Sequence, residues 1–217
     1  SDLNLISKHF QTRSEQEKKD FDNSFNKNLD VLSIEKNSIN SSEVFDYLRS
    51  KKIDYIFVYG PGIIGKETMF AYPRRIINMH LGLSPYYRGS GTNFWPIVNG
   101  EVQYCGVTIH FLDEGIDTGD LIFQGRASVN KDDTIHSLGS KIIKVGIKLI
   151  CESIDAISKD NFSPLRQDLS IGKTYYRKDF NADAVKKAYE NIENNLFGKY
   201  QKKQHQLLKG VPVYEVK

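Results

Sequence analysis

The sequence predicts an α/β fold in which an open, mostly parallel β-sheet carries helices on both faces. Two observations lead to this prediction. Patterns typical of buried strands and of amphipathic helices alternate along residues 41–158, as expected when parallel strands are joined by helical crossovers. Two apolar runs also end in polar, glycine-containing segments, at residues 60–62 and 78–91, and an open α/β sheet presents its functional groups at such strand ends. The 217 residues are enough for one domain of this kind and a short helical appendage at the carboxyl terminus.

The first fifty residues contain few regular patterns. Residues 11–26 are rich in charge, which predicts a short exposed helix or an ordered loop. Residues 29–34 are predicted to form a short edge strand. An amphipathic helix then begins after the serines at residues 41–42 and ends near Lys51, with cations at its carboxyl end.

The clearest buried strand covers residues 53–59, which are almost all β-branched or aromatic. The Gly-Pro-Gly sequence at 60–62 ends this strand. Residues 63–70 are predicted to form a loop and a short helix, and residues 75–79 a second strand. This order of elements implies parallel pairing of the two strands.

The middle of the chain predicts a long hairpin. Before it, residues 92–98 favour one or two helical turns, with Trp95 as the large apolar anchor. Residues 102–112 alternate between apolar and polar side chains, as a half-buried strand does. The acidic loop 113–120, which contains two glycines, joins this strand to another at residues 121–129.

Two more helices are predicted towards the carboxyl end. The first is capped by Asp132 or Asp133 and continues to about Ser158, with a regular apolar stripe. The second, from about Asn181 to Gln204, is polar and weakly amphipathic. It is a candidate contact in a homodimer.

The composition argues against several classes of protein. The net charge of +3 comes from 30 basic and 27 acidic residues, a balance that disfavours a nucleic-acid or membrane partner. Cys105 and Cys151 are predicted to be buried and reduced. The spacing of His and Cys residues matches no short metal-ligand pattern, so we expect no metal site. A signal peptide or membrane-spanning run is not recognisable, and the cytoplasm is therefore the expected compartment.

Three polar residues are the best candidates for chemistry. Asn78 and His80 are two residues apart at a strand end, so they face the same side, and Asp117 lies in the loop of the predicted hairpin. Taken singly, each residue fits an ordinary turn or a hydrogen-bonded surface position. Together they suit acyl transfer to an amine, with Asn78 donating to an oxyanion, His80 relaying a proton and Asp117 orienting His80. Ser84 lacks the Gly-x-Ser-x-Gly context of a hydrolase nucleophile. His110 lies on the polar face of its strand pattern, which could bring it near the site, but a structural histidine is the favoured interpretation.

Four motifs occur in a fixed order: Asn-x-His at 78–80, Leu-Ser-Pro-x-Tyr-Arg-Gly at 83–89, Gly-Val-Thr-Ile-His at 106–110 and Gly-Ile-Asp-Thr-Gly-Asp at 115–120. In this respect the chain resembles the 10-formyltetrahydrofolate-dependent formyltransferases, most closely over residues 53–124. The resemblance implies a Rossmann-like fold, with 10-formyltetrahydrofolate as formyl donor and no metal. It also implies roles for individual residues. The catalytic residues would be Asn78, His80 and Asp117; the donor-binding residues Tyr59, Gly60, Pro61, Gly62, Ile63, Ile64, Asp113, Glu114 and Gly115; and the acceptor-binding residues Ser84, Tyr86, Tyr87, Arg88, Gly89 and Trp95, of which Trp95 is favoured as a core residue.

The sequence departs from that family in three places. Leu81 to Pro85 replaces a segment of Pro-Ser-Leu-Leu-Pro character beside the acceptor. We expect that the opening strand, helix and second strand of the family are missing or truncated here. We also expect no full barrel domain after Ser170, which disfavours a tRNA acceptor. We therefore expect a catalytic domain at residues 1–160 and a carboxyl-terminal extension at residues 161–217.

The expected function is formyl transfer to a primary amine, with a nucleotide-linked amino sugar as the preferred small-molecule acceptor. Alternatives are formylation of another small amine such as glycinamide ribonucleotide, and hydrolysis of 10-formyltetrahydrofolate. A methionyl-tRNA formyltransferase and a non-catalytic folate-binding module are less favoured.

Overall fold

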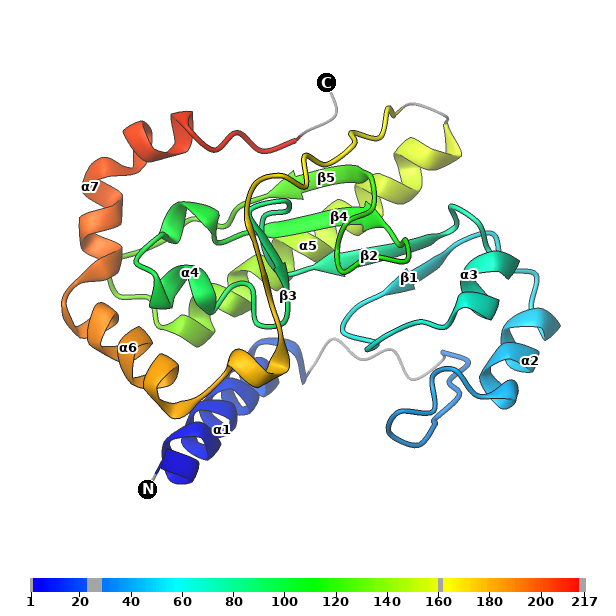
Figure 1. The fold of residues 1–217 in the computed structure, drawn as a ribbon, viewed down its shortest axis with the longest axis horizontal. Helices are drawn as coiled ribbons and strands as arrows, with labels where there is room; N and C mark the ends of the chain where they lie inside the picture. Colours follow the sequence, from blue (N-terminus) through cyan, green and yellow to red (C-terminus); the bar gives the residue numbers. More distant parts are fainter. Residues whose placement is uncertain (1, 23–28, 160–161, 215–217) are drawn as a thin grey trace.

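The structure is a computed structural model that describes residues 2–22, 29–159 and 162–214 (Figure 1). Its helices are α1 (Asp2–Phe21), α2 (Ser42–Ser50), α3 (Lys66–Ala71), α4 (Trp95–Val98), α5 (Ile135–Ser158), α6 (Ala182–Glu193) and α7 (Leu196–Lys209). Its strands are β1 (Ile56–Val58), β2 (Ile76–His80), β3 (Tyr87–Gly89), β4 (Val107–Phe111), β5 (Leu121–Gly125) and β6 (Lys173–Tyr175). None of the helices in these residues has the length and apolar character needed to cross a membrane.

The main sheet has four strands in the order β1-β2-β4-β5. β1 and β2 are parallel and are connected through α3, whereas β2·β4 and β4·β5 are antiparallel. The predicted α/β class is therefore confirmed, and the sheet is mixed. The parallel pairing is limited to β1·β2 because the hairpin predicted between the next two strands turns the chain back on itself.

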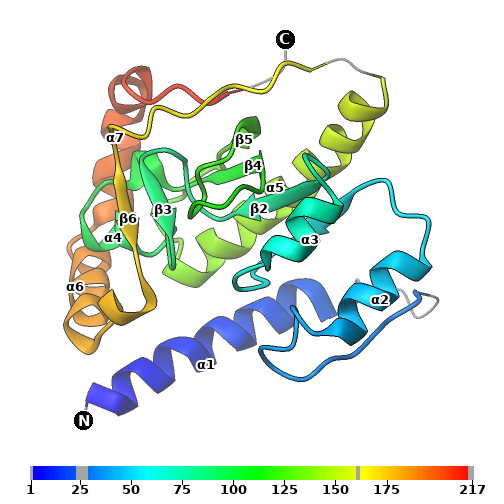
Figure 2. The same cartoon turned by 45° about the vertical axis from the view of Figure 1, so that its right-hand side comes forward.

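The core lies between this sheet and α5, which lies behind the sheet in Figure 1 and contacts β4 and β5. Gly146 of α5 allows close approach, because a Cβ at this position would overlap the side chain of Met79. Ile77, Val107 and Ile109 in the sheet are completely buried. On its other side α5 contacts α1, which also packs against α6 (Figure 2).

The carboxyl-terminal part of the chain builds a second, two-stranded sheet. β6 pairs in parallel with β3, and neither strand was predicted from the sequence. Beyond it, α6 contacts α1 and α4, and α7 packs against the short 3-10 helix Val102–Tyr104. The single last helix predicted from the sequence is wrong, because Asn195 adopts the left-handed conformation (φ 59°) and separates α6 from α7. The division at residues 160–161 stays a prediction.

Several local predictions near the amino terminus are also wrong. Residues 2–21 form a single helix rather than a short helix or loop. Residues 29–34 form no strand, and Leu29 and Val31 are about 60% exposed because no neighbouring strand covers them. The buried strand predicted at residues 53–59 is only three residues long and half-buried.

Later in the chain, three further predictions need correction. Residues 102–104 form a 3-10 helix instead of the first part of a strand. The cap of α5 is Thr134, whose hydroxyl accepts a hydrogen bond from the Ser137 amide, while the Ser137 hydroxyl accepts from the Thr134 amide. Cys151 is exposed on α5, although Cys105 is buried and both thiols are free as predicted.

Candidate active site

Asn78, His80 and Asp117, the three residues predicted to act together, are in contact. Asn78 and His80 lie on β2 with their side chains on the same side, and Asp117 comes from the loop between β4 and β5. Asn78 Nδ2 donates to Asp117 Oδ1 at 3.0 Å, and His80 Nδ1 lies 3.1 Å from Asp117 Oδ2. Asn78 and His80 are 8% and 6% exposed, so the group is largely shielded from water. The catalytic role of the three residues stays a prediction.

The loop carrying Asp117 has an unusual backbone. Asp117 itself has φ 52°, in the left-handed region that few residues other than Gly, Asn and Asp occupy. Two residues later, Gly119 passes so close to Phe111 that a Cβ would overlap the Phe111 carbonyl oxygen. The Asp and Gly residues in this motif are therefore needed for the path of the loop as well as for its chemistry.

His110 is a fourth member of the group. It is paired with Asn78 across β2·β4 and is completely buried. Its Nε2 lies 3.2 Å from Asn78 Nδ2 and 3.4 Å from Asp117 Oδ1, and its Nδ1 lies 2.8 Å from the Phe111 carbonyl oxygen. A carbonyl only accepts, so in the neutral ring Nδ1 carries the proton and Nε2 accepts from Asn78. Sequence reasoning favoured a purely structural histidine here; the alternation of β4 was the only signal that placed it towards the site.

Strand β3 supplies two backbone contacts to the group. The Tyr87 carbonyl oxygen lies 2.8 Å from His80 Nε2, and the Gly89 amide donates to Asp117 Oδ2 at 2.8 Å. Gly89 has φ 92°, and a Cβ there would overlap the Tyr175 carbonyl oxygen of β6. Glycine is therefore required at this position both for its conformation and for the close approach of β6.

The electrostatics of the site hold Asp117 charged and His80 ready to accept a proton. Burial lowers the pKa of His80, and the Asp117 carboxylate and Tyr87 carbonyl offset this only in part. Burial alone would raise the pKa of Asp117, but the neighbouring His80 and His110 rings and the hydrogen bond from the Gly89 amide outweigh it, so the net pKa lies below the ordinary range. Both ring nitrogens of His80 face acceptors. A proton taken up by His80 therefore gains a second hydrogen bond, which suits a proton acceptor in catalysis.

The two loops predicted to bind the donor are linked through the start of α3. Lys66 Nζ forms an ion pair of 2.7 Å with Glu114 Oε2. Asn40 fixes the end of the first loop by donating to the Ile63 carbonyl and accepting from the Gly65 amide, at 2.8 and 2.6 Å. The Ile63 side chain is 85% exposed and so is available to an apolar ligand. The assignment of these loops to the donor stays a prediction.

The residues predicted on the acceptor side differ in their surroundings. Ser84 is almost fully buried, and Tyr87 and Trp95 are buried as well. Tyr175 of β6 lies between the latter two, with ring centroids 5.7 Å from Tyr87 and 4.5 Å from Trp95 in stacked geometry. Tyr175 therefore already occupies one face of each of these rings. Tyr86 is only half-buried and lies against Tyr104.

Arg88 is buried with part of its guanidinium group unpaired in the described part of the chain, as is the Ser84 hydroxyl. Arg88 is 8% exposed, and within the described part of the chain its Nε and Nη1 atoms have no hydrogen-bond partner. A buried guanidinium without an acceptor is costly, and an anionic ligand group would remove that cost. Its backbone lies between Tyr87 and Gly89, the two residues that contact His80 and Asp117.

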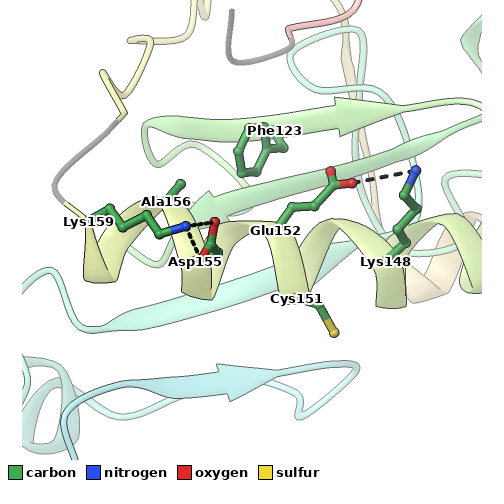
Figure 3. A pocket seen from close by; sticks show the side chains of 7 residues that line it. All are labelled: Phe123, Lys148, Cys151, Glu152, Asp155, Ala156 and Lys159. Carbon is green, nitrogen blue, oxygen red and sulfur yellow. Dashed lines mark hydrogen bonds and ion pairs between the residues drawn. The ribbon is translucent and has the colours of Figure 1, made fainter.

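Two hollows among the described residues lie outside this site. The first is drawn in Figure 3 and lies along α5 beside Phe123. Its charged side chains are paired with each other, Lys148 with Glu152 and Lys159 with Asp155. The second is lined by residues from several segments, including Tyr55, Arg74, Phe111, Phe162 and Pro164. Nor does this part of the chain group three or more His, Cys, Asp or Glu side chains for a metal ion.

Comparisons with known proteins agree on one family. Residues 4–154 match the family model described as formyl transferase. A methionyl-tRNA formyltransferase of Desulforamulus reducens is 33% identical over 167 residues, which is 76% of this chain and 50% of that protein. The chain spans about half the length of the curated relatives it matches.

Solved structures of formyltransferases are also similar to this chain. The formyltransferase PseJ from Anoxybacillus kamchatkensis, in complex with UDP-4,6-dideoxy-4-formamido-L-AltNAc and tetrahydrofolate, is 26% identical with a TM-score of 0.54, covering 69% of this chain and 72% of that one. WlaRD, a sugar 3N-formyl transferase solved in the presence of dTDP and 5-N-formyl-THF, is 31% identical with a TM-score of 0.53, covering 58% and 46%. The chain belongs to the formyl transferase family.

Proposed function

We propose that this chain transfers a formyl group from 10-formyltetrahydrofolate to the primary amine of a nucleotide-linked amino sugar. The observation that carries the proposal is the contact of Asn78, His80 and Asp117 within hydrogen-bond distance on a shielded strand end. A site that only bound folate would not need an amide donor, an imidazole and a carboxylate converging on one point.

The proposed mechanism gives each of the three groups one step. The amine attacks the formyl carbon, forming a new C–N bond and a tetrahedral oxyanion to which the Asn78 amide donates. Because Asn78 Nδ2 donates to Asp117 Oδ1 and His110 Nε2 in this structure, the amide exchanges one of these acceptors for the oxyanion. The proton lost by the amine passes to His80, held by Asp117, and then to the tetrahydrofolate nitrogen as its bond to the formyl carbon breaks.

The choice of acceptor rests on Arg88 and on the relatives. A nucleotide-linked sugar carries a diphosphate, which can satisfy the buried Nε and Nη1 atoms of Arg88. The formyltransferase PseJ was solved in complex with a UDP-linked formamido sugar and tetrahydrofolate, and WlaRD is a sugar 3N-formyl transferase. Both are more than 25% identical to this chain.

A second candidate acceptor is methionyl-tRNA. The curated relatives at 33% identity, including that of Desulforamulus reducens, are methionyl-tRNA formyltransferases. The shared region covers the reaction site and about half of those proteins, so the likeness supports the formyl-transfer chemistry more strongly than the acceptor.

A parallel assay separates the candidates. The protein is incubated with 10-formyltetrahydrofolate and, in turn, UDP- and dTDP-linked 3- and 4-amino sugars, glycinamide ribonucleotide, methionyl-tRNA or no amine, and products are identified by mass spectrometry. We expect a formylated nucleotide sugar and little formate without an amine. Formylated methionyl-tRNA alone would favour the second candidate, and formate at the same rate with and without amines would favour a hydrolase.

A further inference from the structure

Gln167 lies outside the residues that match the family model, 4–154, and directly contacts the loop of the candidate site. It is 6% exposed, and its Nε2 donates to two backbone carbonyls of that loop, Asp117 O at 2.9 Å and Gly119 O at 2.6 Å. Its Oε1 is buried and has no partner within the described part of the chain. The amide is therefore oriented by these two donated hydrogen bonds.

These hydrogen bonds hold the part of the loop that has the left-handed backbone conformation. Asp117 has φ 52°, a left-handed conformation that is unfavourable for a residue other than glycine. Its carboxylate must meet His80 on one side and Asn78 on the other. Fixing the carbonyls of residues 117 and 119 sets the orientation of the peptide units between them, and so the direction of the Asp117 side chain.

The segment that carries Gln167 is itself firmly attached. Leu165 and Leu121 exchange two backbone hydrogen bonds of 2.8 and 2.9 Å at the edge of β5. Farther along, β6 pairs with β3, and the Ser90 amide donates to Tyr175 O at 2.8 Å. Figures 1 and 2 show this segment running from the end of α5 across to β3. One stretch of chain thus supports both the Asp117 loop and the strand that contacts His80.

We propose that Gln167 is a positioning residue for formyl transfer, acting through Asp117 by holding the 117–119 backbone. This inference rests on the proposed function. It predicts that the reaction site includes residues 162–176, and that a chain ending near residue 154 would hold Asp117 less firmly.

The test compares Gln167→Met with a matched control, Asn191→Leu. Asn191 Nδ2 also donates to two backbone carbonyls, those of Ile97 and Val98 at 2.8 and 2.9 Å, but between α6 and α4. We expect Gln167→Met to lower kcat by roughly 10²-fold with KM changed by about twofold or less, since small displacements of a reacting group have effects of this size. Asn191→Leu should retain kcat within about twofold. Equal losses in the two variants would overturn the proposal.

Two further measurements separate positioning from a general loss of structure. In an Asp117→Asn background, Gln167→Met should cause little additional loss, because both changes remove the same oriented carboxylate. Gln167→Glu places an acceptor against two carbonyls, and its activity relative to Gln167→Met should rise as the pH falls from about 8 to about 6 and the buried carboxyl protonates. Two results would contradict the proposal: additive losses in the Asp117→Asn, Gln167→Met double variant, or an activity ratio of Gln167→Glu to Gln167→Met that does not change with pH.

A measurement without substrates distinguishes failure of the Gln167 proposal from failure of the proposed function. The imidazole signals of His80 and His110 are titrated by NMR in the wild type and in Gln167→Met. Displacement of the Asp117 carboxylate should move the His80 titration to lower pH, because that carboxylate favours the protonated ring. This shift is expected even if no acceptor is formylated. An unchanged His80 titration would overturn the role of Gln167 while leaving formyl transfer untouched.

Discussion

Replacing Asp117 by Asn tests the electrostatics of the candidate site with almost no change of shape. The carboxylate lies near three donors, the Gly89 amide at 2.8 Å, Asn78 Nδ2 at 3.0 Å and His80 Nδ1 at 3.1 Å, while His110 Nε2 lies 3.4 Å away. An Asn side chain has only one acceptor oxygen and no charge. If its oxygen faces Gly89 and His80, its NH2 group meets the NH2 group of Asn78, and one hydrogen bond is lost.

The expected loss of activity follows from the lost hydrogen bond and the lost charge. A hydrogen bond to a charged group contributes about 1.5–3 kcal/mol, equivalent to a factor of roughly 10–100 in rate. Proton transfer through a correctly placed acid–base group contributes about 10²–10⁴-fold. Asp117→Asn should therefore lower kcat/KM at least about 10²-fold. The measurement is the initial rate of formyl transfer at saturating 10-formyltetrahydrofolate.

The same variant makes a prediction about stability. The folded-state pKa of Asp117 is lowered, so its carboxylate stabilises the fold above the unfolded pKa, about 3.9, and that contribution is lost as the pH falls through the folded pKa. The difference in unfolding free energy between wild type and Asp117→Asn should shrink below about pH 4. Asp120→Asn, which only weakens a partly exposed ion pair with Arg74, serves as the control. The reasoning is refuted if Asp117→Asn keeps half of the wild-type rate, or if Asp120→Asn loses as much.

Three further predictions follow from the contacts. Asn78→Ala should lower kcat by roughly 10²–10³-fold because an oxyanion donor is lost, while its melting temperature changes by only a few degrees; near-normal turnover in this variant would remove Asn78 from the mechanism. Burial lowers the pKa of His9 to about 4 and also lowers that of His136, whose ring centroid lies 4.7 Å from that of His9. Stability should therefore fall as the pH drops from about 6.5 towards 4, and His9→Phe should make this fall smaller. A thermal-unfolding titration of the wild type that stays flat over this range would contradict the prediction. Gly89→Ala should destabilise the fold by more than about 1 kcal/mol, because of its φ of 92° and the overlap with Tyr175; calorimetry showing an unchanged melting temperature would exclude that overlap.

The sequence was informative where one local pattern determines the structure. The α/β class followed from the alternation of apolar patterns, and the hairpin around residues 113–120 from its acidic loop between two strand patterns. The grouping of Asn78 and His80 followed from the two-residue period of a strand, which needs no tertiary information. Asp117 joined them only as a hypothesis about a loop, whose left-handed backbone and return towards β2 appear in the structure.

The features that sequence reasoning missed depend on contacts between distant segments. β3 and β6 are three-residue strands whose pairing joins residues 87–89 to 173–175, and such short segments carry no periodic pattern. His110 was interpreted as structural because its partner, Asn78, is 32 residues away on another strand. Gln167 gave no signal, since one Gln in a polar stretch is common and its two carbonyl partners are about 50 residues earlier. The half-buried β1 was overestimated because an aromatic, β-branched run predicts burial without specifying its neighbours.

The most direct test of the account is a formyl-transfer assay on the wild type and Asp117→Asn with the same amine. Both proteins are incubated with 10-formyltetrahydrofolate and a UDP-linked 4-amino sugar, and the mass of the nucleotide sugar is followed with time. The account predicts a gain of one formyl group in the wild-type reaction, at a rate at least about 10²-fold above that of the variant. Two results would contradict the claim that Asn78, His80 and Asp117 form a formyl-transfer site. One is a wild type that formylates none of the amines of the parallel assay, and the other is an equal rate in the wild type and Asp117→Asn.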